Sequence, residues 1–111
     1  MNIYDTANRL ASEIKQSEEY MNYKMAKQAL NLNTELKKKM SEFEQLRYEA
    51  QIVQLQTGKE DTEKMNKVRE MFELLMQEDE AKKFFDAETK FNIVIADVNK
   101  IIGEAIRDVM Q

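Results

Sequence analysis

The chain has 111 residues, of which 42% are hydrophobic and 34% charged, and its 17 basic and 21 acidic side chains give a net charge of −4. It contains no cysteine and no histidine, which excludes disulfides, thiolate nucleophiles, cysteine-ligated metal centres and the commonest general base. Two glycines and no proline are too few turn formers for a β-sheet protein, so we expect an all-α fold, and the net acidity argues against a general nucleic-acid binder.

Two helices are expected in the N-terminal third of the chain. Apolar residues at three- and four-residue spacing predict the first of them, over residues 3–16. Ser17 is a favoured N-cap residue, and Glu18 and Glu19 suit the positive end of a following helix. That second helix is expected over residues 18–30.

Two further helices are expected on either side of the clearest turn of the chain. A helix over residues 34–57 would end at Gly58, a residue favoured at helix C-caps, and Asp61 or Thr62 would cap a helix over residues 63–76. The earlier helix carries apolar stripes on two sides, which suggests contact with two neighbours, or with a neighbour and a second subunit. These stripes consist of Leu36, Met40, Phe43, Leu46, Ala50 and Val53, and of Tyr48, Ile52 and Leu55.

The strongest pattern in the sequence predicts a long amphipathic helix over residues 79–110. Its apolar residues recur every seven positions in adjacent rows, as they do on the apolar face of a helix. Glu88 interrupts one of these rows. Because a buried, unpaired carboxylate is costly, we expect Glu88 to pair with a lysine or arginine of another helix or subunit, or to stay near solvent. Recognition of a partner protein is the alternative role.

The length of this last helix bears on assembly. A helix over residues 79–110 spans about 48 Å, whereas a compact chain of this size has a diameter of roughly 35 Å. Its apolar C-terminal part would therefore project from a monomer, and we expect a homodimer that covers it. The expected dimer or partner interface consists of Phe84, Glu88, Phe91, Ile95, Val98 and Ile102.

The densest basic patch is the run Lys37-Lys38-Lys39. Such a run can contact RNA phosphates, but it is also typical of a solvated helix face. An RNA-binding protein is therefore an alternative to an adaptor, although we do not expect nucleic acid to be the main partner.

Paired carboxylates suggest a second alternative. Glu70 and Glu73 are three residues apart and would share a helix face, where such pairs can hold Mg²⁺. The all-α nucleotide pyrophosphohydrolases of the MazG kind use an EExxE motif followed by ExxD. Here Asn22 stands where the third acid after Glu18 and Glu19 would be, and the chain contains no ExxD. Solvated acids on exposed helix faces are the alternative interpretation.

The order of several short motifs resembles the YlbF/YmcA-like proteins, particularly their YheA-like subgroup. The first match is the opening sequence NIYDTANRL, over residues 2–10. The later matches are Ser17-Glu18-Glu19-Tyr20 with Tyr23 and Ala26, then Phe43, Gln56-Thr57-Gly58, Phe84-Phe85-Asp86-Ala87-Glu88, and Val98 with Ile101 and Ile102. Together these motifs cover essentially the whole chain.

This resemblance implies a small all-α protein of firmicute-type bacteria, commonly dimeric and without known enzymatic activity. In that family, YlbF and YmcA join a third protein in a complex that supports an endoribonuclease, RNase Y, in mRNA processing. The complex also affects competence, sporulation and biofilm formation. Some such complexes carry iron–sulfur clusters on cysteines, which this chain lacks. We therefore expect no cofactor and no bound metal.

Taken together, these patterns predict a single domain over residues 1–111, an antiparallel bundle of about five helices with a long C-terminal helix. We expect a non-enzymatic, dimeric adaptor that acts through protein–protein interaction, with sister family proteins or an endoribonuclease as partners. The N-terminal residues lack the basic start and apolar run of a signal peptide, and no apolar run is long enough for a membrane span. We therefore expect a soluble, cytoplasmic protein.

Overall fold

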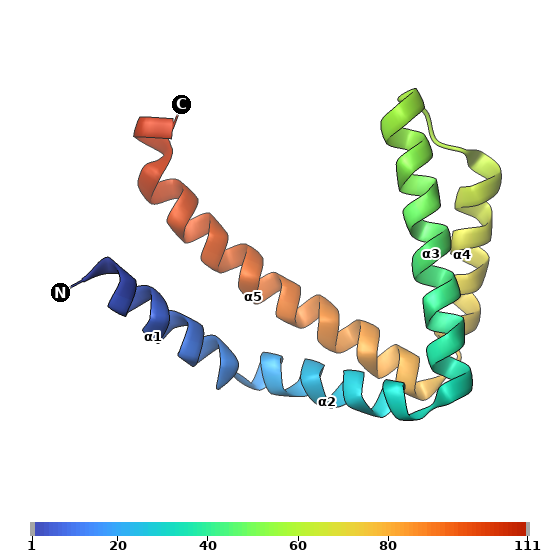
Figure 1. Ribbon diagram of the computed structural model, residues 1–111, viewed down its shortest axis with the longest axis horizontal. Helices are drawn as coiled ribbons and strands as arrows, with labels where there is room; N and C mark the ends of the chain where they lie inside the picture. The colour runs from blue at the N-terminus through green and yellow to red at the C-terminus, as the bar shows by residue number, and fades with distance from the viewer. Residues whose placement is uncertain (1, 111) are drawn as a thin grey trace. The chain divides into compact units, whose positions relative to one another are not determined.

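The structure, a computed structural model, describes residues 2–110 and contains five α-helices and no strand within that range (Figure 1). This confirms the all-α prediction and the long C-terminal helix. The observed helix ends lie within two residues of the expected ones. The helices are α1 (Ile3–Lys15), α2 (Glu18–Leu32), α3 (Thr34–Thr57), α4 (Thr62–Leu75) and α5 (Asp79–Met110).

Local capping interactions explain where these helices begin and end. The side-chain oxygens of Ser17, Asn33 and Asp61 each accept a hydrogen bond from the backbone N–H three residues later, at 3.1–3.2 Å. Such bonds satisfy donors that the first turn of a helix leaves free. Gly58 ends α3 with a φ of 74°, the left-handed conformation that glycine adopts most readily. Because Asn33 and not Asn31 caps α3, α2 extends two residues beyond its expected end.

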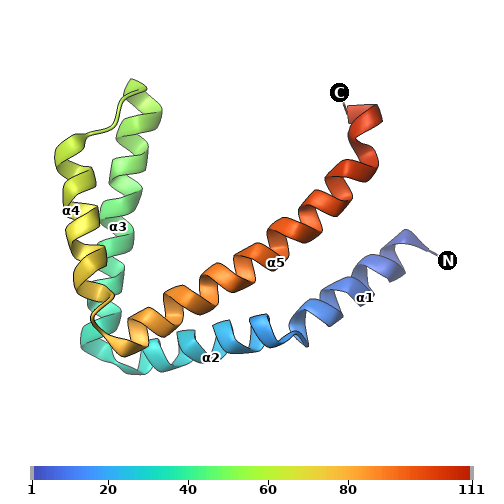
Figure 2. The ribbon, with the colours of Figure 1, turned by 180° about the vertical axis from the view of Figure 1, so that it is seen from behind.

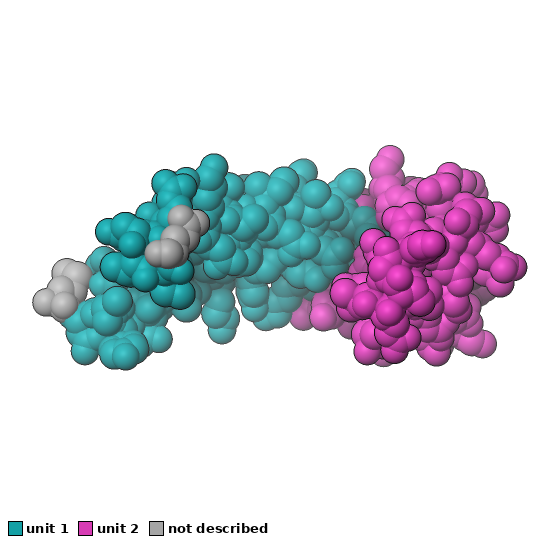
Figure 3. Space-filling model, turned by 90° about the horizontal axis from the view of Figure 1, so that it is seen from above, with its two compact units in different colours: residues 1–26, 84–111 teal, residues 27–83 magenta. Residues whose placement is uncertain are grey.

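The chain forms two compact units, which Figure 3 shows in different colours. Unit 1 comprises residues 1–26 and 84–111, and unit 2 comprises residues 27–83. Both α2 and α5 contribute residues to each unit. In unit 1, α2 and α5 lie side by side and antiparallel (Figures 1 and 2), and aromatic rings of the two helices are in contact.

Unit 2 is built around the antiparallel pair α3 and α4. The expected inward stripe of α3 is confirmed, since Leu36, Met40, Phe43 and Ala50 are all buried. The Phe43 ring lies 6.0 Å from that of Phe72 on α4. The second apolar stripe of α3 is largely uncovered, with Tyr48 63% exposed and Leu55 75% exposed. One neighbouring helix therefore covers one of the two stripes.

Among residues 2–110, none of the helices is both long enough and apolar enough to cross a membrane.

Candidate functional site

An aromatic cluster in unit 1 joins α2 to the first half of the expected interface row. Tyr20 lies 5.9 Å from Phe91 between ring centroids, and Tyr23 lies 5.5 Å from both Phe84 and Phe91. These are favourable separations for tilted and edge-to-face aromatic pairs. Phe84 is only 7% exposed. Phe84 and Phe91 therefore make contacts within the subunit, between α5 and α2.

Glu88 lies on α5 between Phe84 and Phe91, and its carboxylate is half-buried. The hydroxyl group of Tyr23 donates a hydrogen bond to Oε2 of Glu88, at 3.2 Å. The expectation was a lysine or arginine of another helix or subunit, or a position near solvent, and within the subunit the structure supplies a phenol from α2. A hydrogen bond to a charged acceptor is stronger than a neutral one and limits the cost of keeping a carboxylate beside aromatic rings.

Burial decreases along the expected interface row towards the C-terminus. Ile95 and Val98 are half-buried, whereas Ile102 is 49% exposed. In the same C-terminal part of α5, Ile101 is 69% exposed, Ile106 44% and Val109 78%. We refer to Ile101, Ile102, Ile106 and Val109 as the C-terminal apolar surface of α5. The apolar face of α5 that looked continuous in the sequence is therefore covered up to Val98 and largely uncovered from Ile101 onwards.

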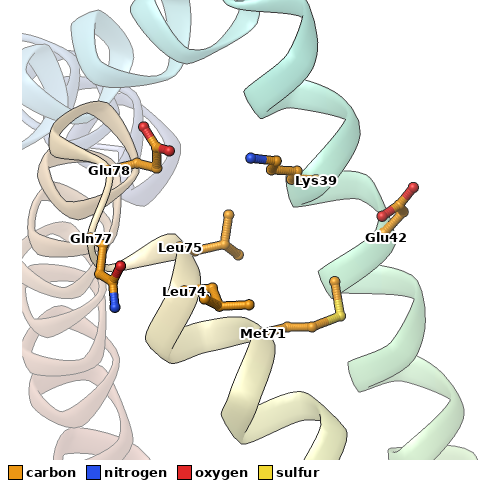
Figure 4. Close-up of a pocket in the computed structure, with 7 residues that line it drawn as sticks. All are labelled: Lys39, Glu42, Met71, Leu74, Leu75, Gln77 and Glu78. Carbon is orange, nitrogen blue, oxygen red and sulfur yellow. The ribbon is translucent and has the colours of Figure 1, made fainter.

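The lysine run lies on the exposed face of α3, in unit 2. Lys37, Lys38 and Lys39 are all exposed. Lys39 also lines an open cavity of about 350 Å³, together with residues of α4 and of the turn that follows it (Figure 4). The structure thus places the lysine run in a different unit from the expected interface row.

The cavity was not anticipated from the sequence. Its lining consists of Lys39, Glu42, Met71, Leu74, Leu75, Gln77 and Glu78. The signal that points to it is the pair Leu74-Leu75. Adjacent helical residues project about 100° apart, so one leucine of such a pair tends to lie away from the centre of the buried face. Leu75 is 3% exposed and Leu74 is 65% exposed.

The carboxylate pair proposed for Mg²⁺ lies on a solvent-exposed face. Glu70 and Glu73 are both exposed on α4. Across residues 2–110, no group of three or more acidic side chains has the arrangement needed to hold a metal ion.

The family was established by comparison with known sequences. The sequence model described as control of competence regulator ComK, YlbF/YmcA, matches residues 3–107. The chain belongs to the YlbF/YmcA family. This confirms the resemblance carried by the motifs that run from residue 2 to Ile102.

Individual relatives of this YlbF/YmcA family member match over nearly their whole lengths. A UPF0342 protein of Desulfitobacterium hafniense is 34% identical over 110 residues, covering 99% of this chain and 89% of that protein. A UPF0342 protein of Clostridium novyi is 32% identical over 108 residues, covering 97% and 95% respectively. Among solved structures, RicA of Bacillus subtilis, crystallised in complex with RicF, is similar with a TM-score of 0.64 and 25% identity. That match covers 98% of this chain and 96% of RicA.

Proposed function

We propose that this YlbF/YmcA family protein is a non-enzymatic, dimeric adaptor of the cytoplasm that acts through protein–protein contacts. The observation that carries the proposal is the C-terminal apolar surface of α5. Four large aliphatic side chains that are 44–78% exposed on one helix form the kind of apolar patch that marks an interaction site. A partner that covers these four side chains would explain their exposure, and a catalytic role would not.

The same surface supports a homodimer. Ile102, Ile106 and Val109 follow one another at helical spacing. They continue the apolar row that α2 covers nearer the N-terminal end of α5. Burying them against a second copy would remove apolar area from water, which is favourable by about 25 cal/mol per Å². In this proposal, Ile95, Val98 and Ile102 belong to the interface, while Phe84, Glu88 and Phe91 position α5 from within the subunit.

The similarity to RicA supports a sister protein of the same family as a further partner, because RicA was crystallised in complex with RicF. The family resemblance extends this proposal to an endoribonuclease, and so to RNA processing, competence, sporulation or biofilm formation. These cellular roles follow from the family alone.

Matched substitutions on opposite sides of α5 test the dimer. Ile102 is 49% exposed and Ile93 is 55% exposed. They are nine residues apart, which is about 180° around a helix. Light scattering should show a dimer for the wild type and for Ile93→Asp, and a monomer for Ile102→Asp, with unchanged helix content by circular dichroism. A wild-type monomer at tens of micromolar, or equal effects of the two substitutions, would contradict the proposed interface.

A pull-down of the tagged chain from native cytoplasm, with and without ribonuclease, tests the adaptor role. Recovery of sister helical proteins or of an endoribonuclease after ribonuclease treatment supports the adaptor. Partners lost on treatment would indicate RNA binding, which substitution of Lys37, Lys38 and Lys39 by Glu should then abolish. Calorimetry with Mg²⁺ and nucleotide should give no heat, and saturable heat would overturn the non-enzymatic assignment in favour of a nucleotide hydrolase.

A further inference from the structure

The cavity of unit 2 has an apolar wall that the chain itself does not cover. Figure 4 shows Met71, Leu74 and Leu75 extending from α4 towards the space beside α3. Leu75 is buried, but Leu74 remains 65% exposed although it lines a cavity. The volume of about 350 Å³ lies at the lower end of the range of ligand pockets, roughly 300–1,000 Å³. It suits an inserted apolar side chain better than a large ligand.

The polar residues that line the cavity favour one sign of charge in a bound partner. Lys39 and Glu42 come from α3, and Gln77 and Glu78 from the turn after α4. Figure 4 shows Lys39 extending towards the side on which Glu78 lies. Among the residues that line the cavity, two carboxylates against one ammonium group give a net acidic charge. An occupant with basic groups beside its apolar part is therefore electrostatically complementary.

We propose that this cavity binds an amphipathic helix of a partner protein, whose apolar anchor inserts against Leu74 and whose flanking basic side chains face Glu42 and Glu78. Insertion of helix-borne anchors into apolar grooves is a recurring mode of protein recognition. Met71 suits such a site because the unbranched methionine side chain adapts to the shape of an anchor. The proposal rests on the adaptor function proposed above, and it adds a contact in unit 2 to the one on α5.

The test uses the full chain and a defined probe. The probe is a synthetic amphipathic helix with leucines along one face and lysines beside them. Two matched peptides replace either the leucines by alanine or the lysines by glutamate. Methyl NMR of the full chain should show saturable shifts of Met71, Leu74 and Leu75 with the first peptide and none with the other two. Titrating Ile102→Asp in parallel removes binding to the C-terminal apolar surface of α5 as an explanation.

Two exposed leucines of unit 2 provide a matched pair of variants. Leu74 lines the cavity, whereas Leu55, which is 75% exposed on α3, does not. Leu74→Asp should weaken peptide binding by about tenfold or more, as expected for the central contact of an interface. Leu55→Asp should leave it unchanged.

Charge reversals at the cavity test the sign of the electrostatic argument. Glu78→Lys should weaken binding and Lys39→Glu should strengthen it, both effects being larger at low salt. Shifts confined to α1 and α5, equal losses for Leu74→Asp and Leu55→Asp, or charge effects of the opposite sign would each overturn the proposal. None of these results depends on dimerisation. The proposal for the cavity can therefore be wrong while the proposed α5 dimer is right, and the reverse also holds.

Discussion

The half-buried carboxylate of Glu88 is held by the Tyr23 hydroxyl across a hydrogen bond of 3.2 Å. We predict that Tyr23→Phe, which keeps the ring and removes the donor, lowers the free energy of unfolding by about 1.5–3 kcal/mol, the range for a hydrogen bond to a charged group. Urea denaturation followed by circular dichroism measures this change. Tyr48→Phe is the control, because Tyr48 is 63% exposed on α3, and it should have no effect. Equal losses in the two variants would mean that the bond to Glu88 contributes nothing.

The two glycines should respond to alanine with opposite signs. Gly58 has a φ of 74°, and a Cβ there would meet no atom within 4 Å, so the cost of Gly58→Ala is that of the backbone alone. We predict a loss of about 1–2 kcal/mol. Gly103 lies within α5, also with open space around it, and Gly103→Ala should stabilise the protein by about 0.5–1 kcal/mol. Thermal melts of both variants at one protein concentration decide the matter, and a shift of the same sign for both would refute the argument.

At the scale of elements, α4 illustrates how one helix serves both the core and a surface. Leu75 is 3% exposed and its neighbour Leu74 is 65% exposed. Leu75→Ala should therefore cost about 2–5 kcal/mol through lost burial and the cavity that it leaves. Leu74→Ala should change stability by less than about 0.5 kcal/mol. Denaturant titration of the two variants compares the same chemical change at adjacent positions, and similar costs would show that Leu74 is part of the core.

The helices α3 and α5 show the limit of periodicity as a predictor. Each has apolar residues at helical spacing that the sequence identifies correctly as faces. On α3, Phe43 is buried while Leu55 is exposed, and on α5, Phe84 is buried while Ile102 is exposed. Periodicity reports which residues share a face, but burial depends on which face a neighbouring helix covers and on how far along that face it extends. Here α4 covers one of the two stripes of α3, and α2 covers only the first part of the α5 row.

At the scale of the whole molecule, we propose that the two units unfold as one domain, because α2 and α5 each continue from one unit into the other. Calorimetry should then show a single transition. Its midpoint should rise with protein concentration, since dimerisation stabilises the folded state by mass action. Ile102→Asp should remove that dependence, and Ile93→Asp should keep it. Two separate transitions would show that the units are independent domains.

Sequence by itself determined the helices of this protein and its family. The bounds of α1 to α5 depend on local features, such as the caps at Ser17, Asn33 and Asp61 and the left-handed Gly58, which act within a few residues of the chain. The motifs that place the chain in the YlbF/YmcA family are likewise readable in order along it.

Only the tertiary structure decided which apolar side chains are buried within the subunit and which charged side chains find a partner there. The partner of Glu88 is a tyrosine 65 positions away, and no local pattern distinguishes it from a lysine or arginine. The same holds for the uncovered end of α5 and for the cavity beside Leu74. Both depend on packing between segments that are distant in the sequence, and not on the spacing of residues within one helix.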